Sequence, residues 1–212
     1  MAIEYNDKFQ AFFQNLLIDE GGYVPASRAR NINDAGEATK YGISLKFLRS
    51  LHLNESDLNH DGIIDENDIV ILTESQAKEL YFLHFWNPLY ARINNVQLAY
   101  RLFNFGVNAG TRTAVRLLQE IVNETLMSET LLTDGVFGIN SLNVVNGFTN
   151  GQKLYDNYII RISEYYKSLH KPQFLSGWLN RLKNVLPDRI IKKLVTNYFI
   201  ITSFLVILFS FT

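Results

Sequence analysis

Apolar residues recur at the helical period along most of this chain, and that periodicity restricts it to a mainly α fold. The clearest stripe predicts a first helix that is capped by Asp7 and ends at Gly21-Gly22. Its apolar positions follow the spacing of one buried helix face: Phe9, Phe12, Phe13, Leu16 and Leu17. The pattern predicts further helices from Ser44, from Thr73 to His84, and at about 96–108, 112–125 and 152–169. The second of these is expected to open with a capping box at Thr73–Gln76. The polar residues 23–43 predict a loop or a small irregular hairpin after the first helix.

Composition narrows the chemistry. The 212 residues are 47% hydrophobic, which suits one compact unit or two small lobes. A net charge of -1 leaves no basic excess for phosphates, so we expect no nucleic-acid partner. The absence of cysteine excludes disulfides, thiolate metal sites and cysteine nucleophiles. The four histidines have no zinc-site spacing, so carboxylates and hydroxyls are the main candidates for catalysis.

The stretch Val195–Thr212 contains no Asp, Glu, Lys or Arg. As a helix it would span about 27 Å, close to the hydrocarbon thickness of a bilayer. Lys192 and Lys193 precede it, as is typical of a membrane flank. We therefore expect a C-terminal transmembrane helix after a basic flank, within 188–212, with a buried core helix as the alternative. The N-terminal sequence has early acidic residues and no continuous apolar segment, so we expect no cleavable signal peptide.

Glu20 continues the stripe of the first helix, four residues after Leu16. Burial disfavours the charged form of a carboxyl group and raises its pKa, which keeps a glutamic acid protonated for general-acid catalysis. The glycines that follow would let a substrate approach closely. The alternative is a partly exposed glutamate at a frayed helix end.

Two segments, Asp19–Val24 and Asn33–Ser44, together resemble the E-G-G-Y…D-P-G-G-x-T-x-x-G-I-[ST] signature of glycoside hydrolase family 108. The resemblance continues in order over about residues 8–186, through Phe85-Trp86-Asn87-Pro88, Asn108-Ala109-Gly110, Leu118-Gln119, Asp134–Gly138 and Gly177–Arg181. The family comprises N-acetylmuramidases of phage-endolysin and secretion-associated type with a lysozyme-like fold.

The resemblance implies a muramidase that cleaves the β-1,4 bond between N-acetylmuramic acid and N-acetylglucosamine. It places Glu20 at the catalytic acid position, with Asp34 and Thr39 assisting. A second carboxylate stabilises oxocarbenium charge or activates water, and a hydroxyl positions that water. Ala35 and Glu37 depart from the family pattern, which leaves Asp34 open as a turn-forming residue and Glu37 as a substitute carboxylate.

The substrate-binding candidates are Tyr23 and Tyr41, which flank the motif and carry rings that can stack on sugars, and Asn108, carried over from the resemblance. We predict a catalytic lobe at 1–95 and a helical peptidoglycan-binding lobe at 96–187.

Residues 57–68 follow the order of oxygen ligands in an EF-hand loop, with Gly62 at the sharp turn. The predicted Ca²⁺ ligands are Asp57, Asn59, Asp61, the carbonyl of Ile63, Asp65 and Asp68. Position 12 is Asp rather than Glu, which predicts weak affinity. We expect a structural calcium ion, with a coincidental polar turn as the alternative.

The predicted partners are peptidoglycan glycan strands and the bacterial inner membrane. The basic flank favours a cytoplasmic domain, whereas peptidoglycan lies outside the membrane, so a holin-like or secretion pathway would have to deliver the enzyme. Two other hypotheses stay open: a membrane-anchored peptidoglycan-binding protein without catalysis, and a calcium-responsive regulator.

Overall fold

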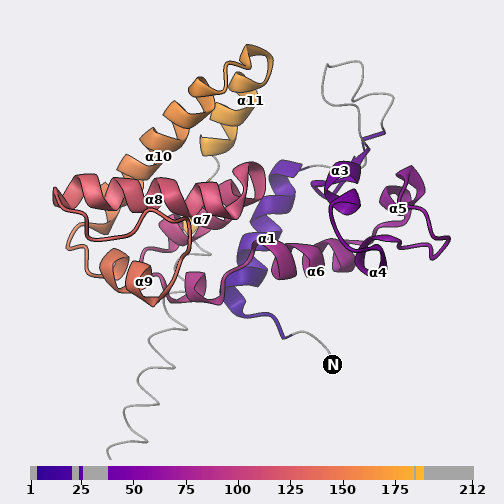
Figure 1. Ribbon diagram of the computed structural model, residues 1–212, viewed down its shortest axis with the longest axis horizontal. Coiled ribbons are helices and arrows are strands. Elements are labelled where there is room, and N and C mark those ends of the chain that lie inside the picture. The colour runs from indigo at the N-terminus through magenta and orange to yellow at the C-terminus, as the bar shows by residue number, and fades with distance from the viewer. Residues whose placement is uncertain (1–3, 21–23, 26–37, 184, 189–212) are drawn as a thin grey trace, which may run out of the picture. The chain divides into compact units, whose positions relative to one another are not determined.

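Helices make up most of the computed structural model, which describes residues 4–20, 24–25, 38–183 and 185–188, with only the backbone described for Asp19 and Glu20. Within these ranges the chain forms ten α-helices, one 3-10 helix and one two-stranded antiparallel sheet (Figure 1). This confirms the mainly α prediction. The predicted transmembrane stretch lies outside the described residues. Among those described, no helix combines the length and apolar character needed to cross a membrane.

The chain divides into two compact units. We call Phe13–His84 the inner unit, because the other unit is formed by residues on both sides of it in the sequence, 4–12 and 85–188 of the described chain. The latter is called the outer unit. The predicted catalytic and peptidoglycan-binding lobes are functional divisions with other boundaries, and they stay a prediction.

Helix α1 (Asp7–Glu20) supplies residues to both units. Its cap differs by one residue from the prediction, because Asn6 Oδ1 accepts the Phe9 N–H at 2.9 Å while Asp7 is the first helical residue. Both residue types cap helices well, and an acidic residue in the first turn also favours the helix dipole. Four side chains of the predicted stripe are fully buried, which confirms it: Phe9, Phe12, Phe13 and Leu16. Leu17 is half-buried.

The inner unit consists of short elements after α1. In order, they are β1 (Thr39–Lys40), β2 (Ile43–Ser44), α3 (Leu45–Arg49), α4 (Leu53–Ser56), α5 (Glu66–Ile71) and α6 (Glu74–Phe85), whose last residue belongs to the outer unit. Ser44 caps α3 by accepting the Phe47 N–H at 3.1 Å. The predicted capping box at α6 is present, because the Thr73 and Gln76 side chains each accept the other residue's backbone N–H, at 3.2 and 2.9 Å.

Strands β1 and β2 form the small hairpin that the sequence allowed. Thr39 pairs with Ser44 and Lys40 with Ile43, so Tyr41 and Gly42 form a two-residue loop. Their φ angles of 53° and 76° are both positive, as a type I′ turn requires. Val24 pairs with Thr39 on its other edge through backbone hydrogen bonds of 2.8 and 2.9 Å.

Longer helices build the outer unit. After the 3-10 helix η1 (Pro88–Arg92) come α7 (Val96–Ala109), α8 (Thr111–Leu126), α9 (Ile139–Asn146), α10 (Gly151–Ser168) and α11 (Pro172–Lys183). Helix α8 packs against α7 and α10, and α10 also packs against α11 (Figure 1). Aromatic rings fill much of the core. Phe12 contacts Trp86, Tyr100 and Phe103 with centroid separations of 5.9, 5.4 and 6.4 Å.

Helix α7 also holds the end of α11. Arg101 is 1% exposed, and its guanidinium donates to the carbonyls of Arg181 and Leu182 at 3.2 and 3.1 Å. Those carbonyls belong to the last turn of α11, where no intrahelical donor is available. Gln97 then makes two hydrogen bonds to the backbone of Leu186, accepting its N–H at 3.1 Å and donating to its carbonyl at 3.0 Å.

Candidate functional site

Glu20 is the last residue of α1, one turn after the fully buried Leu16. Its side chain lies outside the description, as do all of Tyr23, Asp34 and Glu37. The separation between the two predicted carboxylates, which would distinguish a retaining from an inverting enzyme, therefore stays open.

Thr39 is held firmly by its backbone. It begins β1, and its N–H and carbonyl both bond to Val24, the fourth residue after Glu20. Asp34 belongs to residues 26–37, which lie outside the described residues, and the Val24–Thr39 bridge joins the described chain on either side of them. The Thr39 side chain is half-buried, which leaves part of it accessible. This geometry joins Val24 to the backbone of Thr39, the residue that carries the predicted assisting hydroxyl.

Tyr41 occupies the first position of the hairpin turn. Its carbonyl accepts a 3.0 Å hydrogen bond from the hydroxyl of Tyr81, a fully buried residue of α6. Lys40 Nζ lies 5.6 Å from the centroid of its ring and donates to the Val70 carbonyl at 2.6 Å. These contacts stabilise a left-handed backbone that tyrosine rarely adopts. Tyr41 therefore has a structural role, and its stacking on sugar stays a prediction.

Asn108 lies in the outer unit, on α7. Its amide donates to the Asn104 carbonyl at 2.9 Å and accepts from Arg181 at 2.7 Å. Both ends of the amide thus hold the outer unit together, and Arg181 of the Gly177–Arg181 motif is one of its partners. Binding of substrate by Asn108 stays a prediction.

The predicted calcium loop is ordered by hydrogen bonds from its own backbone. The Asp57 carboxylate accepts the backbone N–H groups of Asp61 and Gly62 at 3.2 and 2.8 Å. One oxygen of Asp61 accepts the backbone N–H of Ile63, and its other oxygen accepts a hydrogen bond from the side-chain amide of Asn59, both at 2.8 Å. Gly62 has a φ of 87°, which explains the glycine at the sharp turn.

Asp68 closes the loop. Its fully buried carboxylate accepts the Leu58 N–H at 2.7 Å and the Asp65 N–H at 2.9 Å, and Asp65 completes a capping box for α5. In the part of the chain that the structure describes, no group of three or more histidine or acidic side chains is arranged to hold a metal ion. The order of oxygen ligands along the loop matches a calcium loop, and in this structure backbone N–H groups bond to carboxylates among them. Calcium binding stays a prediction.

Residues of the Asp134–Gly138 motif are also used internally. Asp134 Oδ1 accepts the Val136 N–H at 2.8 Å and the Gln119 amide at 3.0 Å, and these two bonds, the backbone one foremost, lower the pKa of Asp134. Gln119 in turn accepts the Gly135 N–H at 2.9 Å. A Cβ at Gly135 would lie 2.6 Å from the Arg112 carbonyl oxygen, so no other residue fits without movement. The motif fixes the loop between α8 and α9.

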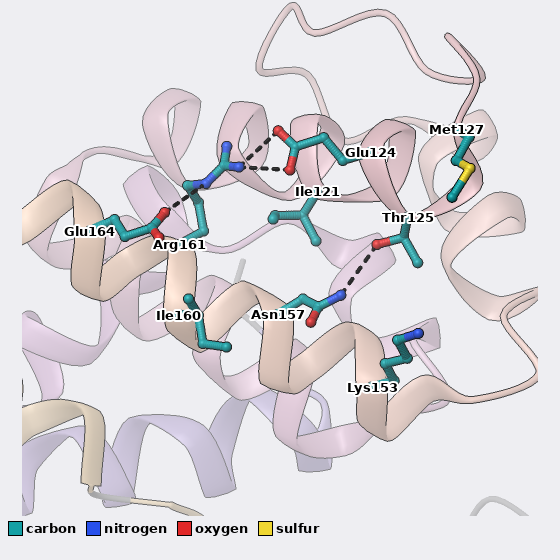
Figure 2. Close-up of a pocket in the computed structure, with 9 residues that line it drawn as sticks. All are labelled: Ile121, Glu124, Thr125, Met127, Lys153, Asn157, Ile160, Arg161 and Glu164. Carbon is teal, nitrogen blue, oxygen red and sulfur yellow. Dashed lines mark hydrogen bonds and ion pairs between the residues drawn. The ribbon is translucent and has the colours of Figure 1, made fainter.

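One feature escapes the sequence reasoning entirely: a groove of about 430 Å³ between α8 and α10 (Figure 2). Arg161 lies along it and pairs with glutamates from both helices. The only local signal is the spacing of Arg161 and Glu164 on one helix, because Glu120 and Glu124 come from a helix about 40 residues earlier.

Comparison with known proteins gives two findings. Residues 13–110 match the protein family described as Glycosyl hydrolase 108. The chain is also similar to the solved structure of Brucella abortus SagA, with a TM-score of 0.63 and 22% identity over 89% of this chain and 94% of that chain. At this identity the likeness shows a shared fold. No curated protein matches the chain significantly.

Proposed function

Because the chain contains a glycosyl hydrolase 108 domain, we propose that it is a lysozyme-like peptidoglycan hydrolase. The bond cleaved is the β-1,4 linkage between N-acetylmuramic acid and N-acetylglucosamine. The match spans residues 13–110 and includes every predicted catalytic position. The glycan strands of peptidoglycan are accordingly the proposed substrate.

The observation that supports this proposal best is the position of Glu20. It ends a helix whose Phe13 and Leu16 are fully buried, and two glycines follow it directly. By its spacing from Leu16, Glu20 continues this face of the helix, and burial there would raise the pKa of a carboxyl group and so keep its proton. In the proposed mechanism Glu20 donates that proton to the oxygen of the leaving sugar as the glycosidic bond breaks.

Asp34 and Thr39 complete the proposed chemistry. Asp34 would either stabilise the positive charge that develops on the sugar ring or activate the attacking water. Thr39 would position that water through its hydroxyl, and the paired backbone of Thr39 and Val24 supports this role because it limits movement of the residue.

The test compares the full wild-type chain with Glu20→Gln on purified peptidoglycan. Glutamine keeps the shape but cannot donate the proton, so release of muramic-acid reducing ends should fall by roughly two orders of magnitude or more. Glu74→Gln, a change at an exposed residue at the start of α6 in the same unit, serves as the matched control and should stay active. An active Glu20→Gln enzyme would mean that another carboxylate is the acid.

A second candidate is a peptidoglycan-binding protein that has lost catalysis. The observation that favours it is the loop Ala35-Gly36-Glu37, where two residues depart from the family pattern. Retention of the wild-type chain on peptidoglycan without release of reducing ends would select this candidate. The double substitution Ala35→Pro with Glu37→Gly, which matches the family pattern, would then be expected to recover hydrolysis.

The proposed location is the bacterial inner membrane, through the uncharged stretch Val195–Thr212. The expected result is that the full chain stays with membranes after alkaline carbonate washing. Release into the wash would remove this part of the proposal and leave the hydrolase unaffected.

A further inference from the structure

The groove between α8 and α10 has no part in the proposed hydrolysis, yet it carries charge at both ends. Figure 2 shows Arg161, Glu124 and Glu164 at one end and Lys153 at the other, with Ile121, Ile160 and Asn157 between them. All of these residues belong to the outer unit.

The first end is acidic beyond what its arginine neutralises. Arg161 holds both oxygens of Glu124 at 2.8 and 2.7 Å and lies 3.3 Å from Glu164. One guanidinium thus faces three carboxylates. Glu124 and Glu164 have side chains that are 56% and 60% exposed, and Glu120 lies 3.2 Å from Arg161 and 3.8 Å from Arg116. Their remaining lone pairs can accept hydrogen bonds from a bound amine.

The second end is basic. Lys153 lies eight residues before Arg161 on α10, which is about 12 Å along the helix axis. Within the described residues its ammonium group has no hydrogen-bond or ion-pair partner. A carboxylate placed there would give it one.

The middle of the groove is apolar with one polar pair. Ile121 is largely buried and Ile160 is 58% exposed, so together they offer a hydrophobic floor and wall. Asn157 donates weakly to Thr125 at 3.4 Å, which leaves amide and hydroxyl groups available to a backbone. About four residues of extended peptide cover 12 Å.

We propose that this groove binds a short peptide that carries a free amine near one end and a free carboxylate near the other. The peptide stem of peptidoglycan is joined to the glycan through its N-terminus, so its free amine is the one on the side chain of its diamino-acid residue. That amine and the carboxylate of the terminal D-alanine are the two groups that the groove would bind. Assigning the stem as the source depends on the proposed function. A bare glycan strand lacks both charges and would leave the two ends of the groove unpaired. The outer unit would thus hold the stem while the inner unit hydrolyses the strand.

The test uses the full chain and the tetrapeptide N-acetyl-L-alanyl-γ-D-glutamyl-meso-diaminopimelyl-D-alanine, whose acetyl group replaces the amide bond to the glycan. Binding is followed by isothermal titration calorimetry. Glu164→Gln and Lys153→Met should each weaken binding by roughly fivefold, because each removes one exposed charge pair. Asp156→Asn and Lys167→Met, on α10 but away from the groove lining, are the matched controls and should bind as wild type. Circular dichroism verifies that each variant is folded.

The proposal is overturned if the tetrapeptide does not bind or if the control variants lose as much affinity as the groove variants. It is also overturned if light scattering shows a dimer that the groove variants dissociate, since a second copy would then be the occupant.

Hydrolysis of peptide-free glycan strands tests the proposed function separately. Glu20→Gln should lose hydrolysis and keep tetrapeptide binding. Binding without hydrolysis in the wild type would retain the groove and refute the hydrolase. Hydrolysis without binding would do the reverse.

Discussion

The inner and outer units are built by different means. Helices α3, α4 and α5 of the inner unit have 5, 4 and 6 residues, and carboxylates such as Asp57 and Asp68 bond the backbone between them. Helices α7, α8 and α10 of the outer unit have 14, 16 and 18 residues. Rings such as Phe105 and Tyr158 join α7 to α10, and α8 buries aliphatic side chains such as Leu118. The predicted catalytic residues lie in the inner unit. Hydrogen-bonded turns therefore determine much of the inner unit, and helix packing determines the outer unit, so the two units should respond to different perturbations.

The largest effect is expected from a cavity in the aromatic core of the outer unit. Phe12→Ala removes a fully buried ring that contacts three others, and it should lower the free energy of unfolding by about 4 kcal/mol. Chemical denaturation measures the change. Phe12→Leu, which fills most of the volume, is the control and should cost clearly less. A loss below about 1 kcal/mol for alanine would show that helix packing does not dominate this unit.

In the inner unit, removal of a buried hydrogen-bonding carboxylate should lower the free energy of unfolding. Asp68→Ala leaves the backbone N–H groups of Leu58 and Asp65 without their buried acceptor, at a cost of about 2 kcal/mol. Hydrogen exchange should quicken at these amides. Asp156→Asn, a substitution at an exposed residue of the outer unit, should leave exchange at the Leu58 and Asp65 amides unchanged. Slow exchange at Leu58 in the Asp68 variant would contradict the role of turn chemistry.

Calcium should stabilise the inner unit selectively if the loop binds it. At a free calcium concentration of ten times the dissociation constant, the gain is about 1.4 kcal/mol. Scanning calorimetry with calcium and with a chelator measures it, and Asp57→Ala should abolish the difference. Identical transitions with calcium and chelator would refute the calcium assignment and leave the hydrogen-bonded loop as sufficient.

The smallest effect concerns the pH dependence of the outer unit. Burial lowers the pKa of Lys8 to about 8, and its Nζ donates to the Ile93 carbonyl at 2.8 Å. Because the unfolded chain keeps the proton up to about pH 10.5, unfolding takes up a proton between these values, and the stability should rise with pH over that window. After allowance for solvent screening the gain is about 1 kcal/mol.

Lys8→Met is the comparison for this window. The difference in unfolding free energy between wild type and variant cancels the titration of the buried tyrosines, which both proteins share. That difference should depend on pH between 8 and 10. A difference that is flat with pH would show that Lys8 is charged in the folded protein throughout.

Sequence patterns predict the fold where the determinants are local. The stripe from Phe9 to Leu16 and the capping box of Thr73 and Gln76 both depend on residues within two turns, and both are confirmed. Helix α11 was not predicted, because Ser176-Gly177 interrupts its pattern and its Trp178 packs on Tyr166 of another helix, at 5.2 Å. Arg101 reads as a surface residue until its distant carbonyl partners are known.

The candidate site follows the same division. The motif locates Thr39 and Tyr41, and the structure places both in one hairpin. The left-handed conformation of Tyr41 depends on Tyr81, forty residues later, which no local pattern reports. The acidic end of the α8–α10 groove likewise needs Glu124 and Arg161 to meet across two helices. The separation of the Glu20 and Asp34 carboxylates stays open, because local sequence does not determine the path between them.

The hold of Arg101 on α11 sets an order on biosynthesis. Its acceptors are the carbonyls of residues 80 and 81 positions further along, so α7 leaves the ribosome long before they exist. At about 5–20 residues per second the wait is on the order of 4–16 s. By then all of Phe13–His84 has been made. A nascent chain arrested before Arg181 would therefore contain the whole sequence of the inner unit but lack the carbonyls that Arg101 binds, so its outer unit could not yet close.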